Sequence, residues 1–307
     1  MKSILIFTLK VAVSIGSLYI VSRSIAWADV GDVLKQAQYS LMVLALVIFW
    51  VAQVFSALRC VYIARVLGGR LDLSTSLRAH FVGLWFNQVL PTSLGGDVIK
   101  IAILREPLGL SIAIRSAILD RLSGLMFLLL ATAITLPLYA NLFPSHPELI
   151  IALGVIAVGG GLAIVLGAWA AHCVSKLSIL NPIFLKLIQI FSDVWAFKKS
   201  SPLWEQAWTS AIVHFNGIVT YALLGFALGI NVDFITFLLV VPVIFLIALI
   251  PVSYAGWGLR EAGAVWLFGM VGIANESALA MSVCFGLLLV AAGLPGLFIF
   301  LYHRASS

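Results

Sequence analysis

The chain of 307 residues is too hydrophobic and too poor in charge to be an ordinary soluble domain. Hydrophobic residues make up 63% of it and charged residues 10%, with a mean hydropathy of +1.15, whereas soluble domains carry roughly 45–50% apolar and about 25% charged residues. The net charge of +6 comes from basic residues scattered in short loops, which is typical of membrane topology signals rather than of nucleic-acid binding. The composition predicts an all-α polytopic membrane protein and excludes a disordered chain.

Hydropathy predicts six full transmembrane helices, because a bilayer core of about 30 Å needs about 20 apolar residues per helix. In chain order the predicted spans are 4–22, 41–63, 112–138, 149–170, 204–229 and 277–301. Two further apolar regions, 79–109 and 236–271, are interrupted near the middle by Pro, Gly and Ser. We expect each to form a re-entrant helical hairpin, since broken backbone at membrane depth must be buried in protein or line a wet cavity. Whether either region instead crosses the membrane is left open.

Loop charges predict that both termini lie in the cytoplasm, by the positive-inside rule. The basic residues that mark cytoplasmic loops are Lys2, Arg59, Arg65, Arg70, Arg78, Lys176, Lys186, Lys198, Lys199 and Arg304. The opposite loops carry Asp29, Asp32, Glu148, Asp233 and Glu276, while Arg23 and Lys35 reduce the contrast in the first of them. The first hairpin then opens to the cytoplasm and the second to the outside. Ala26-Trp27-Ala28 resembles a signal-peptide cleavage site, but Lys10 within the first apolar stretch argues against cleavage.

The two interrupted segments share a sequence pattern that predicts an internal repeat. LPTSLGGDVIK at 90–100 aligns without gaps on IPVSYAGWGLR at 250–260, and the flanking spans follow at the same offset. Because loop charges orient the copies oppositely, the repeat is inverted, as in many secondary transporters. We expect a single membrane domain over 1–307, divided into repeat 1 at 41–140, a linker span with an interfacial helix at 141–203, and repeat 2 at 204–301.

Each hairpin combines a Pro-x-Ser-x-x-Gly turn with a half-helix whose positive N-terminal end attracts anions. With Lys100 and Arg260 as nearby cations, such ends suit a lipid phosphate. Asp97 can pair with Lys100 at i,i+3 or cap the half-helix. The alternative is that Pro and Gly only make the turns and that the basic residues snorkel or pair. The candidate substrate-binding and translocation residues are Asn87, Pro91, Ser93, Gly95, Gly96, Asp97, Lys100, Asp120, Arg121, Ser253, Gly256, Gly258, Arg260 and Glu261.

Catalytic, metal and cofactor sites are not predicted. Cys60, Cys173 and Cys284 lack metal-ligand spacing, and the chain has no H-E-x-x-H, G-x-S-x-G or P-loop motif. Segment 173–200 has apolar residues at helical spacing with lysines nearby, which predicts an interfacial helix on an anionic cytoplasmic leaflet. A cytosolic partner-binding helix is the alternative, and a homo-oligomer is left open.

Three motifs together resemble the membrane region of the lysylphosphatidylglycerol synthetase/flippase family: NQVLPTSLGGD at 87–97, DRLSGL at 120–125 and GLRE at 258–261. The resemblance covers essentially the whole chain and implies re-entrant hairpins in a domain that moves lipids between leaflets. It also implies that the family's polar pathway corresponds to Asn87, Asp97, Asp120, Arg121, Arg260 and Glu261. Aminoacylating members carry a cytosolic acyltransferase-like domain after the membrane region, and this chain ends at Ser307, so we do not expect aminoacyl transfer.

The leading functional hypothesis is a lipid translocase of a bacterial inner membrane, whose substrate is a phospholipid or a lipid-linked headgroup. An enzyme is the first alternative: a glycosyl- or phosphotransferase acting on a lipid carrier through Asp29 or Asp32, or through Asp97 and Asp120. The second alternative is a non-transporting partner of a lipid-modifying complex, bound through 173–200. The sequence names neither the headgroup nor the energy source.

Overall fold

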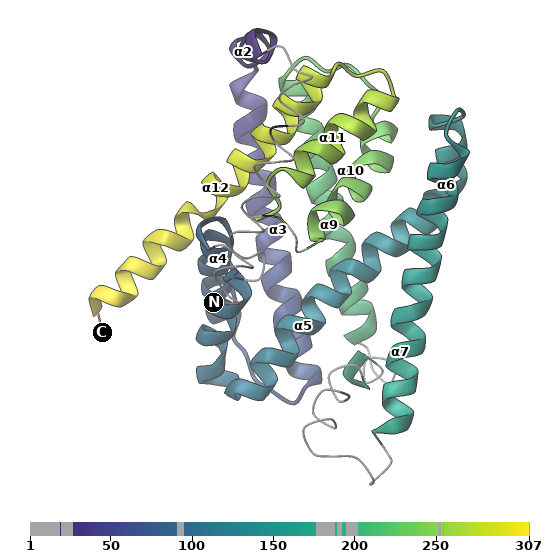
Figure 1. Ribbon diagram of the computed structural model, residues 1–307. Coiled ribbons are helices and arrows are strands. Elements are labelled where there is room, and N and C mark those ends of the chain that lie inside the picture. Colours follow the sequence, from purple (N-terminus) through teal and green to yellow (C-terminus); the bar gives the residue numbers. More distant parts are fainter. Residues whose placement is uncertain are drawn as a thin grey trace.

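The chain folds as an all-α polytopic membrane protein, as its hydropathy predicts. The computed structural model describes residues 19, 27–90, 95–175, 188, 192–194, 202–250, 253 and 255–306, and these contain helices and no strands (Figure 1). In chain order the elements are α2 (Trp27–Lys35), α3 (Tyr39–Val66), α4 (Leu73–Val89), α5 (Gly95–Leu142), α6 (Pro147–Gly154), the π-helical turn η1 (Val155–Gly159), α7 (Gly160–Val174), α9 (Pro202–Ala227), α10 (Phe234–Leu249), α11 (Leu259–Met270) and α12 (Asn275–Ser306).

Five helical segments among the described residues are long and apolar enough to cross a membrane. They are Tyr39–Val66, Gly95–Leu142, Pro147–Val174, Trp204–Ala227 and Asn275–His303, and each contains or largely overlaps one of the predicted spans. The sixth predicted span, 4–22, lies outside the described residues apart from Tyr19. Large aliphatic side chains such as Ile134 and Ile151 are 76% and 67% exposed, which suits helices whose outer faces contact lipid.

α5 comprises two helical arms, which correspond to the second half of the first interrupted region and to the predicted span that follows it. Its two arms meet at Gly109, where φ is 74° and ψ is 155°. Glycine adopts this conformation readily because it has no Cβ. At this residue the chain passes from one helical arm to the other with a sharp change of direction and without a loop.

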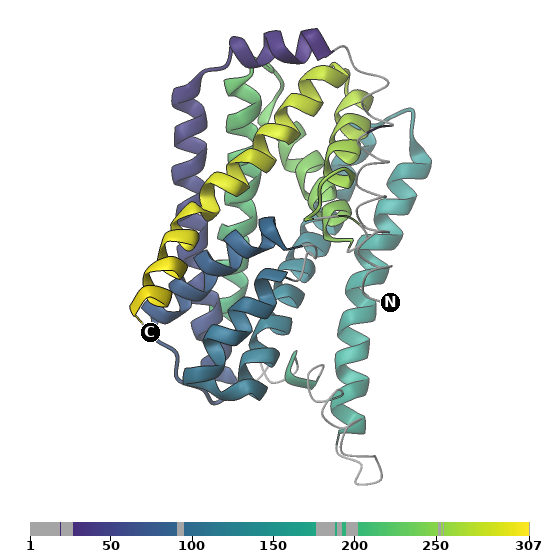
Figure 2. The ribbon, with the colours of Figure 1, turned by 60° about the vertical axis from the view of Figure 1, so that its left-hand side comes forward.

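The two interrupted regions form helix pairs in different halves of the molecule. In Figure 1, α4 lies in the lower half, while α10 and α11 lie in the upper half, with α12 passing obliquely from top to lower left. The same division is visible from the second direction in Figure 2. Both halves of the chain have the order helix, helix pair, helix. In the first half these are α3, the pair of α4 with the first arm of α5, and the second arm of α5; in the second half they are α9, the pair of α10 with α11, and α12. Re-entrance and the inverted repeat stay predictions.

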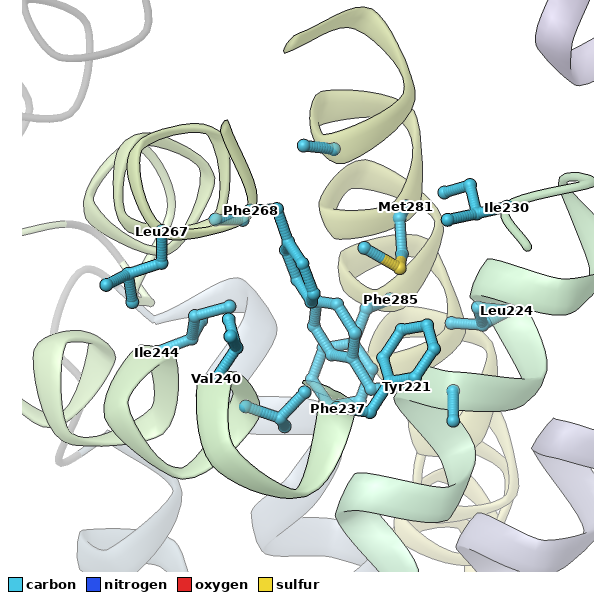
Figure 3. Close-up of a cluster of buried hydrophobic side chains, with 14 of the residues drawn as sticks. Tyr221, Leu224, Ile230, Phe237, Val240, Ile244, Leu267, Phe268, Met281 and Phe285 are labelled. Atoms are coloured by element: carbon cyan, nitrogen blue, oxygen red, sulfur yellow. The ribbon is translucent and has the colours of Figure 1, made fainter. Parts of the chain in front are cut away.

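The largest apolar core lies among α9, α10, α11 and α12 (Figure 3). Tyr221 of α9 stacks on Phe268 of α11 with ring centroids 6.1 Å apart, and Phe237 of α10 meets Phe268 at 5.7 Å. Such offset and edge-on aromatic contacts add to the energy of burial. This core holds the second helix pair as a rigid unit against α12.

Specific polar contacts fix the ends of the first helix pair and the segment after α7. Asp72 caps α4 by accepting a hydrogen bond of 2.8 Å from the N–H of Thr75, and the Ser74 hydroxyl and this N–H hold the pKa of Asp72 below its usual range.

Most of the predicted interfacial segment 173–200 lies outside the described residues. Within it, buried Asp193 forms a bidentate ion pair with Arg115 of α5.

Candidate functional site

Asp120 of α5 joins two buried basic side chains that come from different helices. Its Oδ1 accepts from Arg59 Nε of α3 at 2.7 Å, and its Oδ2 accepts from Lys100 Nζ at 2.9 Å. The side chains of Arg59 and Lys100 are only 6% and 5% exposed, and that of Asp120 is 13% exposed. The trio therefore carries one more positive than negative charge in a region that excludes most water.

His80 of α4 extends this cluster without adding charge. Its Nε2 lies 2.8 Å from Lys100 Nζ and its Nδ1 lies 2.9 Å from the carbonyl oxygen of Ser76. A lysine ammonium only donates, so Nε2 must be the acceptor, and Nδ1–H then donates to the carbonyl. This pattern requires the neutral imidazole, so the excess positive charge on the trio persists.

A second ion pair, Asp97 with Arg121, lies next to the first on the same two arms of α5. Its side chains are more exposed, at 22% and 32%. In a straight helix, residues 20 positions apart are about 30 Å apart, so the contact between Lys100 and Asp120 requires that the arms fold back on each other at Gly109. Asp97 therefore pairs across the bend with Arg121, not with Lys100 at i,i+3.

The start of α5 is held by Asn87 and by two close-packed glycines. The Asn87 side-chain oxygen accepts a hydrogen bond of 2.8 Å from the N–H of Gly96. A Cβ on Gly83 would lie 3.1 Å from the Gly96 carbonyl oxygen, and a Cβ on Gly96 would overlap the Gly83 carbonyl. Gly95 is buried at the first position of α5. The predicted site residues Pro91 and Ser93 lie outside the described residues.

The second helix pair has a closed ion pair at the start of α11. Glu261 accepts a 2.6 Å hydrogen bond from the N–H of Gly258 and another of 2.9 Å from Arg260 Nε, and its side chain is fully buried. The Arg260 guanidinium also lies 4.8 Å from the centre of the Trp257 ring, a cation–π contact. The carboxylate of Glu261 thus fills the anion-attracting end of α11, where we expected a ligand.

Two further predicted residues lie before α11, and the carbonyl oxygen of one of them, Gly256, accepts a hydrogen bond of 3.2 Å from the N–H of Arg260. Gly256 has a φ of 82°, which makes it suited to the turn into α11. Ser253 is buried, and its hydroxyl has no hydrogen-bond partner among the described residues.

Sequence reasoning missed the contributions of α3 and α9 to the first cluster. The sequence places Arg59 among the charges that mark cytoplasmic loops, but it is buried and donates to Asp120. Arg59 Nη1 also donates to Ser210 Oγ of α9, at 3.1 Å. One turn later, His214 stacks on Phe127 of α5 with ring centroids 5.3 Å apart. The available signal was that Arg59 lies within an apolar span, where an ionisable residue is costly.

Comparison with known proteins identifies one family. A family model described as the lysylphosphatidylglycerol synthase TM region matches residues 7–296 of the 307-residue chain. No curated protein and no solved structure matches the chain.

Proposed function

Because the chain belongs to the lysylphosphatidylglycerol synthase transmembrane-region family, we propose that it is a lipid translocase. It moves a phospholipid or lipid-linked headgroup between the leaflets of a bacterial inner membrane, with both termini in the cytoplasm. The observation that carries this proposal is the pair of buried cations, Arg59 and Lys100, that share the single carboxylate of Asp120.

An excess buried cation is unfavourable unless an anion compensates it, because removing a charge from water costs several kcal/mol. A lipid phosphate supplies such an anion while its acyl chains stay in the membrane. The graded exposure of the two ion pairs gives the phosphate a path, from the half-open Asp97–Arg121 pair to the buried Lys100–Asp120 pair. At each step the phosphate pairs with a basic residue, so that residue always has an anionic partner.

Transport is favoured over catalysis by the state of the acidic groups. Asp97 and Asp120, which are among the carboxylates that a transferase could use as general acid or base, are both held in ion pairs. Arg260 and Glu261 are neutralised by each other, so in this proposal they fix α11 against α12 while the first helix pair binds the headgroup. Alternating access comes from movement of one helix pair relative to the other.

The test is leaflet exchange of headgroup-labelled phosphatidylglycerol and phosphatidylcholine in proteoliposomes. We expect Arg121→Gln to slow the exchange of phosphatidylglycerol by about tenfold or more, which corresponds to ~1.4 kcal/mol in the barrier. Arg65→Gln is the matched control, because Arg65 is 62% exposed and lies 3.8 Å from Glu205, away from the cluster. Wild-type exchange by folded Arg121→Gln protein would contradict the headgroup assignment, and no exchange of any lipid by the wild type would contradict translocation.

A further inference from the structure

An apolar groove of about 350 Å³ lies among α5, α6 with η1, and α10. All nine side chains that line it are Leu, Ile or Val. The residues that define its walls are Leu125 and Leu129 of α5, Leu153 and Ile156 of α6 and η1, and Leu246 and Ile250 of the α10 end. The groove offers no hydrogen-bonding side chain, so its occupant must be apolar along its length.

The groove has a buried floor and an exposed rim. Leu129, Leu153 and Val243 are 4%, 4% and 5% exposed. Ile156 and Ile250, in contrast, are 53% and 50% exposed. The groove is therefore open along this apolar rim. The rim at Ile250 is also where α10 ends.

The groove continues the helix face that carries the Asp97–Arg121 pair. Arg121, Leu125 and Leu129 follow each other at i,i+4 spacing, so their side chains lie one above another on one face of α5. Each step advances about 6 Å along the axis. A charged group and an aliphatic channel in this order match the two ends of an amphiphile.

The wall opposite α5 contains the π-helical turn η1. π-Turns are rare in helices and occur frequently at functional sites. Ile156 lies in this turn, and Leu153 lies just before it, so the irregular backbone shapes the groove directly.

We propose that this groove binds an acyl chain of the translocated lipid while the phosphate of the same molecule meets Arg121. This inference rests on the proposed function and adds a tail site to the headgroup site. The lipid is held at both ends during entry, so the protein selects a phosphate joined to a chain rather than a free phosphate.

The experiment uses phosphatidylglycerol with a diazirine in one acyl chain, incorporated with the full-length protein into phosphatidylcholine vesicles. After illumination, mass spectrometry locates the labelled residues, and exchange is measured in parallel. We expect label on residues 125–129 and 246–250. We expect Leu125→Trp to reduce the amount of this label about tenfold, which corresponds to ~1.4 kcal/mol in the free energy of acyl-chain binding. Leu130→Trp is the matched control, since Leu130 lies on α5, is 52% exposed and does not line the groove.

The possible outcomes separate the tail site from the headgroup assignment. Label spread equally over outward residues such as Ile134 would overturn the proposal that the groove binds an acyl chain, and so would equal effects of Leu125→Trp and Leu130→Trp. If the wild type still exchanges lipid in that case, translocation itself is not contradicted. Loss of exchange in Leu125→Trp with normal folding, together with groove label in the wild type, supports the proposal.

Discussion

At the scale of single residues, the charged groups of the two helix pairs are arranged in opposite ways. Lys100 and Arg59 converge on Asp120 from different helices, whereas Arg260 is neutralised by Glu261, the next residue in the chain. The sequence predicts that such residues are important because ionisable groups are costly in apolar segments. It does not predict their partners: the i,i+3 spacing favours Asp97 with Lys100, but the bend at Gly109 gives both residues partners on the other arm.

Glu261 combines two stabilising roles, because it neutralises Arg260 and caps α11 through the N–H of Gly258. Glu261→Ala leaves a buried arginine without its counter-charge, and we expect a loss of ~3–5 kcal/mol in the free energy of unfolding. Glu261→Gln should lose less, since its amide oxygen can still accept from Gly258. Denaturant titration in detergent micelles measures both. Equal stability of Glu261→Ala and wild type would show that the pair contributes nothing to folding.

At the scale of elements, hydropathy predicts the long helices well because a bilayer fixes how many apolar residues a span needs. It does not predict how the two arms of α5 are oriented at Gly109, because an averaged hydropathy profile records apolar content and not backbone direction. The hydropathy profile also does not predict that α12 packs on α4. This packing depends on Gly296, where a Cβ would overlap the carbonyl group of Phe81.

Gly296→Val should push α12 away from α4, since the contact there is with rigid backbone. We expect a loss of about 1–3 kcal/mol in the free energy of unfolding, typical of overpacking. Gly167→Val in α7 is the matched control, because no atom lies within 4 Å of a Cβ at Gly167. Thermal unfolding in micelles compares the two variants with the wild type. An equal loss of stability in both variants would assign the effect to helix propensity and not to the α4–α12 contact.

At the scale of the whole molecule, the predicted orientation can be tested with cysteines. Cys173 is exposed, whereas Cys60 and Cys284 are buried, so Cys173 is the native thiol open to a membrane-impermeant maleimide. With both termini in the cytoplasm, Cys173 should react only after cells are permeabilised. Ser145→Cys, placed in the exposed turn between α5 and α6 in a Cys173→Ser background, should react in intact cells. The reverse pattern would invert the topology.

The order of charges along the two arms of α5 restricts how the first helix pair can move. Where the arms face each other, one arm contributes Asp97 and Lys100 and the other contributes Asp120 and Arg121, and the folded arrangement pairs opposite signs. Sliding the arms past each other in one direction brings Lys100 toward Arg121, and sliding them in the other brings Asp97 toward Asp120. Juxtaposed like charges cost several kcal/mol. The charges therefore hold the two arms in one register: the arms can separate by opening about Gly109, but they cannot slide along each other.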